Sequence, residues 1–345
     1  AAASTAEKTC ARILLKQNPL EWHEIHHHAT ESHLVIPMLT TFTKAVAIQA
    51  ALIGHYKNGG RVNLWLGSKH DLSRLEEEYP KLTNCVHLHV LLDDEHTTKS
   101  IASIPDTIGS MVTVLMTHVS SEEGVRWVQR LNEELREYPS GNHFRVILQS
   151  KPPTTPSTAG EDEDDQYSIE LCVPPPLEGI VHKHLDRLDR VARKVHETWY
   201  HGTTERIQSA LNSNNPTNAA ALQTKPTYKL WTELTEQQRD DNRPAADHID
   251  VMIRAVNLDP NQPDLLEQWG NLSPEDLDML SRMQHERWAA PLWLRNWEAG
   301  ERDDVVGRHP DLIPYEELDE GTQAMDTEQV MNMAEYARLA QEQMV

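Results

Sequence analysis

The sequence predicts an α/β fold in two parts: a doubly wound parallel sheet followed by a mainly helical region. Strand-like and helix-like runs alternate between residues 32 and 150. A polar segment rich in proline and acidic residues follows, and helical periodicity then dominates to the end of the chain. Such alternation is typical of βαβ units, and a polar segment between two patterned regions is typical of a linker.

The first region begins with a βαβ unit. SHLVIPML from residue 32 predicts a buried strand, TKAVAIQAALIGHY a helix of about four turns, and RVNLWLG a second strand. Further strands are expected at CVHLHVLL (85–92), SMVTVLM (110–116) and HFRVILQ (143–149), with a helix in EEGVRWVQRLNEEL before the last. Residues 32–150 are therefore predicted to form a Rossmann-like parallel sheet.

The flanking segments carry less pattern. Residues 1–31 are expected to be an N-terminal extension, and residues 151–177, with KPPTTPSTAGEDEDD, a solvated linker in which SIELCVPP adds one more strand. The histidine cluster EWHEIHHHATESH contains His23, His26, His27, His28 and His33. It matches no established metal-ligand spacing, so a solvated segment is favoured over zinc or nickel ligation and no metal site is predicted.

Residues 178–345 form the helical region and contain an internal repeat, with copies at about 183–258 and 276–345. The motif VHETW of the first copy matches QHERW of the second. The matching pairs are His196 and His285, Trp199 and Trp288, Trp231 and Tyr315, and Asn242 and Asp326. Two related helical units lying side by side are the simplest arrangement for such a repeat.

The second copy resembles the RyR repeat domain of ryanodine receptors and of bacterial proteins that carry it. The resemblance lies in HERW, GERDD, HPDLIPYEEL and the downstream Asp326. The first copy keeps HETW and LWTEL but has NSNNPTNAAALQTKP in place of the central GxxRDD segment. Residues 32–150, with AIQAALIGHYKNGGRVNLWL, resemble the TrkA-N-type Rossmann domain found upstream of RyR repeats. The resemblance implies a tandem RyR-repeat domain whose paired repeats form a cleft for an adenine-type nucleotide.

Each copy is predicted to present an imidazole beside an indole, because helix residues three apart share a face. An indole can stack on a planar base, and a glycine-led loop with Arg302 and Asp303 can contact ribose or phosphate. The predicted ligand-binding residues are His196, Trp199, Trp231, Asn242, Arg243, His285, Trp288, Arg302, Asp303, Tyr315 and Asp326. In the alternative interpretation, Trp199 and Trp288 anchor the core and the histidines make buried polar contacts.

The sheet region carries none of the glycines that dinucleotide binding needs. PMLTTF occupies residues 37–42, where GxGxxG belongs, and GSK occupies residues 67–69, where an acidic residue would bind ribose. The bulky Met38, Leu39 and Phe42 would block the approach of a pyrophosphate. We therefore expect no NAD or other cofactor, and a scaffold role for this region.

The net charge of −22 argues against nucleic acid or anionic lipid as a partner. Three cysteines (Cys10, Cys85 and Cys172) are far apart and odd in number, which favours a reducing compartment and hence the cytoplasm. The chain shows no apolar run long enough to span a bilayer and no signal pattern at its start. Any membrane association is expected to come through a segment outside this chain.

The expected function is ligand sensing without catalysis, since GxSxG, Walker, CxxC and zincin motifs are all missing from the sequence. We expect a cytoplasmic homo-oligomer that binds a nucleotide-type small molecule between two repeats. The resemblance implies that it is the soluble part of a channel-like or anti-phage signalling effector. Two alternatives remain: a structural protein–protein interaction module without a ligand, and an NAD-dependent or nucleotide-hydrolysing enzyme.

Overall fold

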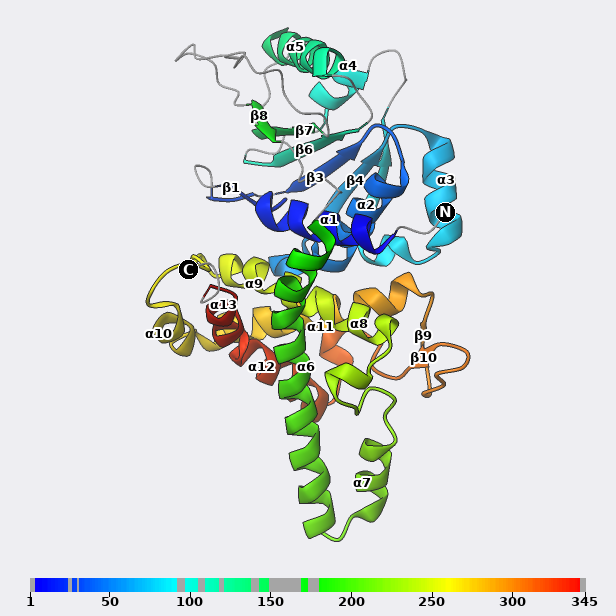
Figure 1. The fold of residues 1–345 in the computed structure, drawn as a ribbon, viewed down its shortest axis with the longest axis vertical. Helices are drawn as coiled ribbons and strands as arrows, with labels where there is room; N and C mark the ends of the chain where they lie inside the picture. The colour runs from blue at the N-terminus through cyan, green and yellow to red at the C-terminus, as the bar shows by residue number, and fades with distance from the viewer. Residues whose placement is uncertain are drawn as a thin grey trace.

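The computed structural model has the predicted α/β architecture (Figure 1). It describes residues 4–23, 27–29, 31–91, 97–104, 109–117, 121–137, 143–148, 169–172 and 180–341. The strands of the main sheet are β3 (Ser32–Ile36), β4 (Val62–Leu66), β5 (Val86–Val90), β6 (Met111–Met116), β7 (His143–Leu148) and β8 (Ile169–Cys172). These six strands are parallel and lie in the order β5-β4-β3-β6-β7-β8. This is the strand order of doubly wound dinucleotide-binding folds, so the predicted fold class is confirmed.

Helices cover both faces of the sheet, which is why its central strands are mostly apolar. The helices of this half are α1 (Thr5–Gln17), α2 (Thr41–Ile53), α3 (Lys69–Glu78), α4 (Thr97–Ala102) and α5 (Ser121–Glu137). Figure 1 shows α1 and α2 on one face and α4 and α5 on the other. All residues of β3 and β6 are buried as a result. Four further residues form the small antiparallel pair of β1 (Trp22–His23) and β2 (His27–His28).

The turn after β3 places no glycine at the start of α2. Thr40 is the N-cap residue: its hydroxyl accepts a hydrogen bond from the Thr43 amide at 3.2 Å, and Thr43 Oγ1 accepts one from the Thr40 amide at 2.7 Å. Helix N-terminal amides that bind pyrophosphate in related folds are therefore partly occupied by the chain's own side chains. That this half binds no NAD stays a prediction.

The segment expected to be a mere extension contains a buried helix. Residues Thr9 to Leu15 of α1 are all buried, and the helix starts with a capping box between Ser4 and Glu7. The sequence signal was STAE, which has the pattern of such a box. His33 lies buried in β3 rather than in a solvated segment, while His26 lies outside the described residues. The acidic run 161–165 and most of the predicted linker also lie outside them.

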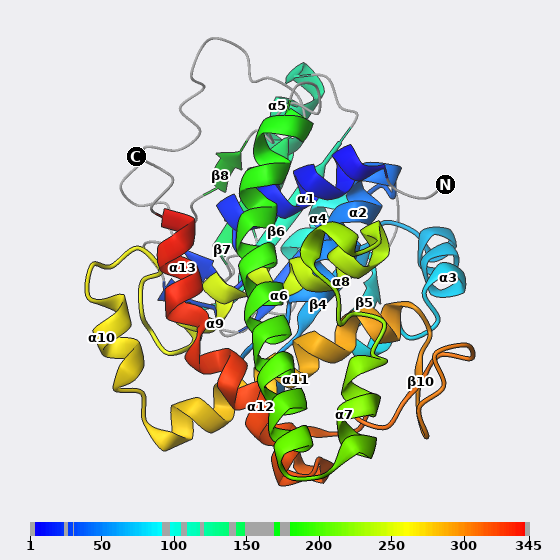
Figure 2. The ribbon, with the colours of Figure 1, turned by 60° about the horizontal axis from the view of Figure 1, so that its bottom comes forward.

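The second half is helical apart from short turns and one two-residue strand pair. Its helices are α6 (Ile180–Asn212), α7 (Pro216–Gln223), α8 (Glu236–Asp247), α9 (Ile249–Ala255), α10 (Leu265–Gly270), α11 (Pro274–Leu294), α12 (Glu320–Met331) and α13 (Met333–Gln341). Helix α6 has 33 residues, so it is about 50 Å long. It extends away from the sheet, with α7 folded back along its far end (Figures 1 and 2).

The two sequence copies have the same order of elements. The first runs α6, η4 (Trp231–Glu233), α8 and α9, and the second runs α11, η5 (Tyr315–Glu317), α12 and α13. Helices α8 and α12 both have 12 residues and begin at side-chain caps, Thr235 and Asp319. The copies differ in the segment between the long helix and the η turn, where their sequences no longer match. The first has α7 there, and the second has a loop with the parallel pair β9 (Glu298–Ala299) and β10 (Arg308–His309).

One hydrophobic core joins the two halves. It includes Leu14 of α1 and Ala47 of α2 together with Met283 and Leu294 of α11. Ten of the 13 residues of α2 are buried, because the helix packs against the sheet on one side and against α8 and α11 on the other. The far face of the sheet has its own core with α4 and α5.

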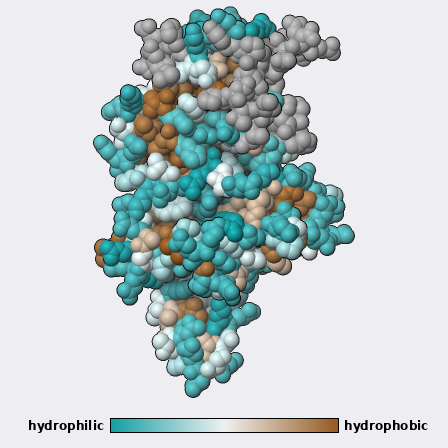
Figure 3. Space-filling view, turned by 180° about the vertical axis from the view of Figure 1, so that it is seen from behind, coloured by the Kyte–Doolittle hydropathy of each residue, from teal (hydrophilic) through white to brown (hydrophobic). Residues whose placement is uncertain are grey.

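The surface seen in Figure 3 is hydrophilic over most of its area, in keeping with a mean hydropathy of −0.61. Among the helices of the described ranges, none combines the length and the apolar character needed to cross a bilayer. Within the same ranges, no cluster of three or more histidine, cysteine, aspartate or glutamate side chains is arranged to hold a metal ion.

Candidate functional site

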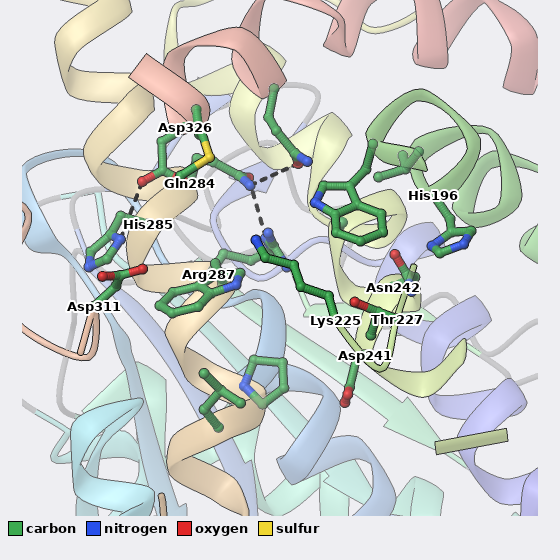
Figure 4. Close-up of a pocket in the computed structure, with 18 of the residues that line it drawn as sticks. His196, Lys225, Thr227, Asp241, Asn242, Gln284, His285, Arg287, Asp311 and Asp326 are labelled. Carbon is green, nitrogen blue, oxygen red and sulfur yellow. Dashed lines mark hydrogen bonds and ion pairs between the residues drawn. The ribbon is translucent and has the colours of Figure 1, made fainter. Parts of the chain in front are cut away.

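A cavity of about 580 Å³ lies between the two copies. Its walls come from α6 and α8 of the first copy and from α11 and α12 of the second (Figure 4). This volume falls within the range of about 300–1,000 Å³ that is usual for small-molecule sites. The predicted residues that line it are His196, Trp199, Asn242, His285, Trp288, Arg302 and Asp326.

Each copy brings an imidazole and an indole to this cavity, as the helical spacing predicted. The ring centroids of His196 and Trp199 are 5.7 Å apart, and those of His285 and Trp288 are 5.6 Å apart. Both histidines are buried, whereas both tryptophans are only partly buried. The indoles therefore have surface left with which to contact a molecule in the cavity.

The two histidines also hold the backbone of the connecting segments. His196 Nε2 lies 2.8 Å from the carbonyl oxygen of Lys229, and His285 Nε2 lies 2.9 Å from that of Ile313. Because a carbonyl only accepts, Nε2 carries the proton in both rings. Each histidine thus fixes the chain two residues before the short η turn of its own copy.

Two predicted site residues, Trp231 and Tyr315, belong to the core and do not line the cavity. They are 7% and 8% exposed, and their rings pack against His196 and His285 with centroids 5.9 and 6.0 Å apart. Both stand at the start of an η turn that packs under the long helix of its copy. These two aromatics therefore anchor the cores of their copies, and neither is among the residues that line the cavity.

Arg243 and Asp303 also lie outside the cavity lining. The Arg243 guanidinium is buried and donates to both carboxylate oxygens of Asp189, at 2.9 and 2.6 Å. Asp303 accepts hydrogen bonds from the amides of Val305 and Val306 at 3.0 and 3.1 Å. Arg243 thus joins α8 to α6, and Asp303 stabilises the turn that follows it. Because both side chains are engaged in this way, neither lines the cavity.

Several polar residues that line the cavity were not predicted from the sequence, notably Lys225, Asp241, Gln284, Arg287 and Arg295. Arg287 lies within the HERW motif, and Gln284 directly precedes it. The position of Arg287 between the histidine and the tryptophan was the sequence signal that could have identified it. Lys225 lies in the first-copy segment that departs from the RyR pattern, so no motif pointed to it.

The carboxylates of the cavity are close to cationic or histidine side chains. Arg295 donates to both oxygens of Asp241 at 2.6 and 2.8 Å. The other such pairs are Arg206 with Glu328 at 2.7 Å, Arg302 with Asp304 at 3.2 Å, His285 with Asp326 at 3.3 Å, and His309 with Asp311 at 3.7 Å. The arginine partners neutralise part of the negative charge that the walls would otherwise carry, whereas burial lowers the pKa of His309.

His285 is poised to carry a positive charge. Burial alone would lower its pKa, but the hydrogen bonds to Asp326 and to the Ile313 carbonyl outweigh burial and raise the pKa above its usual value. Both ring nitrogens face acceptors, and only the protonated ring donates from both. The equivalent of Asp326 in the first copy is Asn242, which has no charge, so the copies differ in this respect.

Asp326→Asn is expected to reduce stability in a pH-dependent manner. Because the folded-state pKa of His285 is raised, its stabilising contribution is complete below the unfolded-state pKa of about 6.5 and is lost as pH rises through the folded-state value. The difference in free energy of unfolding between wild type and variant should therefore shrink from about pH 6 to pH 9. Denaturant titrations across that range measure it. Asn242→Ala is the control, and parallel curves for Asp326→Asn and wild type would contradict the assignment.

Comparison with known protein families identifies one part of the chain. Residues 274–339 match the family model of the RyR domain. The match starts with α11, covers η5 and α12, and ends within α13, so it corresponds to the second copy. Residues 274–339 are thus similar to the RyR domain, and the cavity lies between this segment and a unit with the same order of elements. A comparison with curated proteins found no match for the chain.

Proposed function

We propose that the protein is a sensor that binds a nucleotide-type small molecule in the cavity between its two copies. The observation that carries the proposal is one partly buried indole from each copy in a cavity of about 580 Å³ that also contains charged side chains. Aromatic side chains supply stacking surfaces for nucleobases, and charged groups supply contacts to ribose and phosphate.

The proposal favours binding over catalysis. Each carboxylate named above as lining the cavity lies within ion-pair distance of a cationic or histidine side chain. Proton uptake by a carboxylate engaged in this way would break the pair, although burial raises the pKa of Asp241 in spite of its contact with Arg295. We therefore propose a binding protein and not an enzyme.

Helix α11 provides a physical route from the cavity to the sheet half. Arg287 and Trp288 line the cavity, while the neighbouring Glu286 lies 3.6 Å from Nδ1 of the fully buried His55. Helix α11 also contacts α2 and the turn at Lys57–Gly59. A ligand that moved α11 would thus change contacts with the sheet half, which suits a sensor.

We extend the proposal to the setting that the resemblance implies. The protein would be a cytoplasmic homo-oligomer and the soluble part of a channel-like or anti-phage signalling effector, reaching a membrane through a segment or partner outside this chain. The sheet half, which is similar to TrkA-N-type domains, would be its scaffold. The matched RyR domain at residues 274–339 supports this setting.

A thermal-shift screen against mononucleotides, cyclic nucleotides and ADP-ribose derivatives tests the proposal. A ligand present at 100 times its Kd is expected to add about 2.7 kcal/mol to the free energy of unfolding. Hydrolysis or reduction of a nucleotide during the assay would favour the enzyme alternative. If no nucleotide shifts the melting temperature of the full chain, the proposal fails and the structural-module alternative is favoured.

A further inference from the structure

Arg287 is a buried cation that faces the cavity without a carboxylate partner. It lines the cavity although only 3% of its surface is exposed. Its Nε donates to Oε1 of Gln284 at 3.3 Å, and no carboxylate of the described residues lies within ion-pair distance of its guanidinium. A buried charge is normally paired, so a guanidinium at a cavity wall without a carboxylate beside it is suited to an anionic ligand.

The environment of Arg287 leaves it charged. Burial lowers its pKa to about 10, with Asp326 acting in the opposite direction from beyond ion-pair distance. The guanidinium therefore stays protonated at neutral pH. Its planar fork of N–H donors matches the oxygens of a phosphate group better than a single ammonium does.

Lys225 is a second cation that faces the same cavity. It lies in the connector after α7, is partly buried, and forms no ion pair with a described residue. Burial lowers the pKa of its ammonium, as do the neighbouring Arg302 and Arg206, while Asp311 acts in the opposite direction. In Figure 4 the Lys225 side chain extends toward Gln284 and Arg287.

We propose that Arg287 and Lys225 form an anion subsite that binds the phosphate or pyrophosphate group of the ligand. Two uncompensated cations fit a group with about two negative charges, as a phosphate monoester has near neutral pH, better than a single carboxylate. This placement differs from the sequence-based expectation for Arg302, which already pairs with Asp304 and contacts His309 Nε2 at 3.1 Å.

The subsite is asymmetric although the copies are related. The first-copy residue equivalent to Arg287 is Thr198, whose hydroxyl donates to the Lys194 carbonyl within its own helix at 3.0 Å. The first copy contributes Lys225 instead, from the segment that replaced the GxxRDD motif. One anion subsite, with an indole on each side of the cavity, is thus the arrangement that the charges predict.

Calorimetry with the full chain tests the subsite, using inorganic pyrophosphate and matched pairs of nucleosides and nucleoside 5′-diphosphates. Wild type should bind the diphosphates more tightly than the nucleosides. Arg287→Gln and Lys225→Ala should each weaken diphosphate and pyrophosphate binding about 10- to 100-fold and leave nucleoside binding nearly unchanged. Arg287→Lys keeps the charge without the fork, so it serves if Arg287→Gln does not fold, and it should retain part of the preference.

The controls are Arg282→Gln, on the same helix but outside the cavity lining, and Lys229→Ala, in the same connector as Lys225. Both should bind as wild type does. The anion subsite rests on the proposed function, because it lies in the same cavity. The experiment nevertheless distinguishes failure of the subsite from failure of the nucleotide sensor. Equal binding of nucleosides and diphosphates by every variant overturns the subsite and leaves the sensor standing. Arg287-dependent binding of pyrophosphate without any contribution from a base supports the subsite and overturns the nucleotide sensor. No binding of any probe overturns both.

Discussion

Arg12→Ala is expected to lower the free energy of unfolding by about 3–5 kcal/mol. The Arg12 side chain is 4% exposed and pairs with Asp189 of α6 at 3.0 Å and with Asp247 of α8 at 2.7 Å. Asp247 also accepts a hydrogen bond from Gln49 of α2 at 3.0 Å. The substitution leaves two carboxylates without this cation and removes apolar contacts of its stem, so α1 loses its buried ion pairs with the helical half.

Lys8→Ala is the matched control, because Lys8 also connects α1 to α8. It pairs with Asp240 at 2.9 Å, but its side chain is 53% exposed, so its loss should cost about 0.2–1 kcal/mol. Urea denaturation followed by circular dichroism compares the two variants with wild type. If the two substitutions had the same small effect, α1 would be an attachment of little consequence and not part of the core.

Trp231→Ala is expected to cost about 3–5 kcal/mol of stability, whereas Trp288→Ala should act mainly on ligand affinity, by about 1–3 kcal/mol. Trp231 is 7% exposed and packs with Ala192, Leu234 and Ala246 in a small core. Trp288 is only partly buried and lines the cavity. The comparison thus separates an aromatic that holds its copy together from one that faces a ligand.

Denaturation of both variants and calorimetry with a nucleotide found in the thermal-shift screen would provide the two measurements. The matched first-copy variant Trp199→Ala should behave like Trp288→Ala, since both indoles line the cavity beside a histidine. Severe unfolding of Trp288→Ala with unchanged ligand affinity would instead make it a core anchor, as in the alternative interpretation of the sequence.

The sheet was predictable because its signal is local. Runs such as SMVTVLM are mostly apolar and carry no charged side chain, as expected of parallel strands covered on both faces, and all five strands expected between residues 32 and 150 are observed. The repeat was equally visible, because matching motifs recur at matching spacing. Seven of the eleven predicted site residues consequently line one cavity, with an imidazole–indole pair in each copy.

By itself, then, the sequence determined the class of fold, the repeat and the pairing of histidine with tryptophan. Tertiary structure alone decided which aromatic of each copy faces the cavity and which is buried, since periodicity shows that a face is apolar but not what covers it. It also decided that Arg243 lies in an ion-pair cluster with Asp189, and that Arg287 and Lys225 face the cavity without a carboxylate partner among the described residues. Whether a charge is paired depends on side chains from distant segments, and residue spacing along the chain does not predict those contacts.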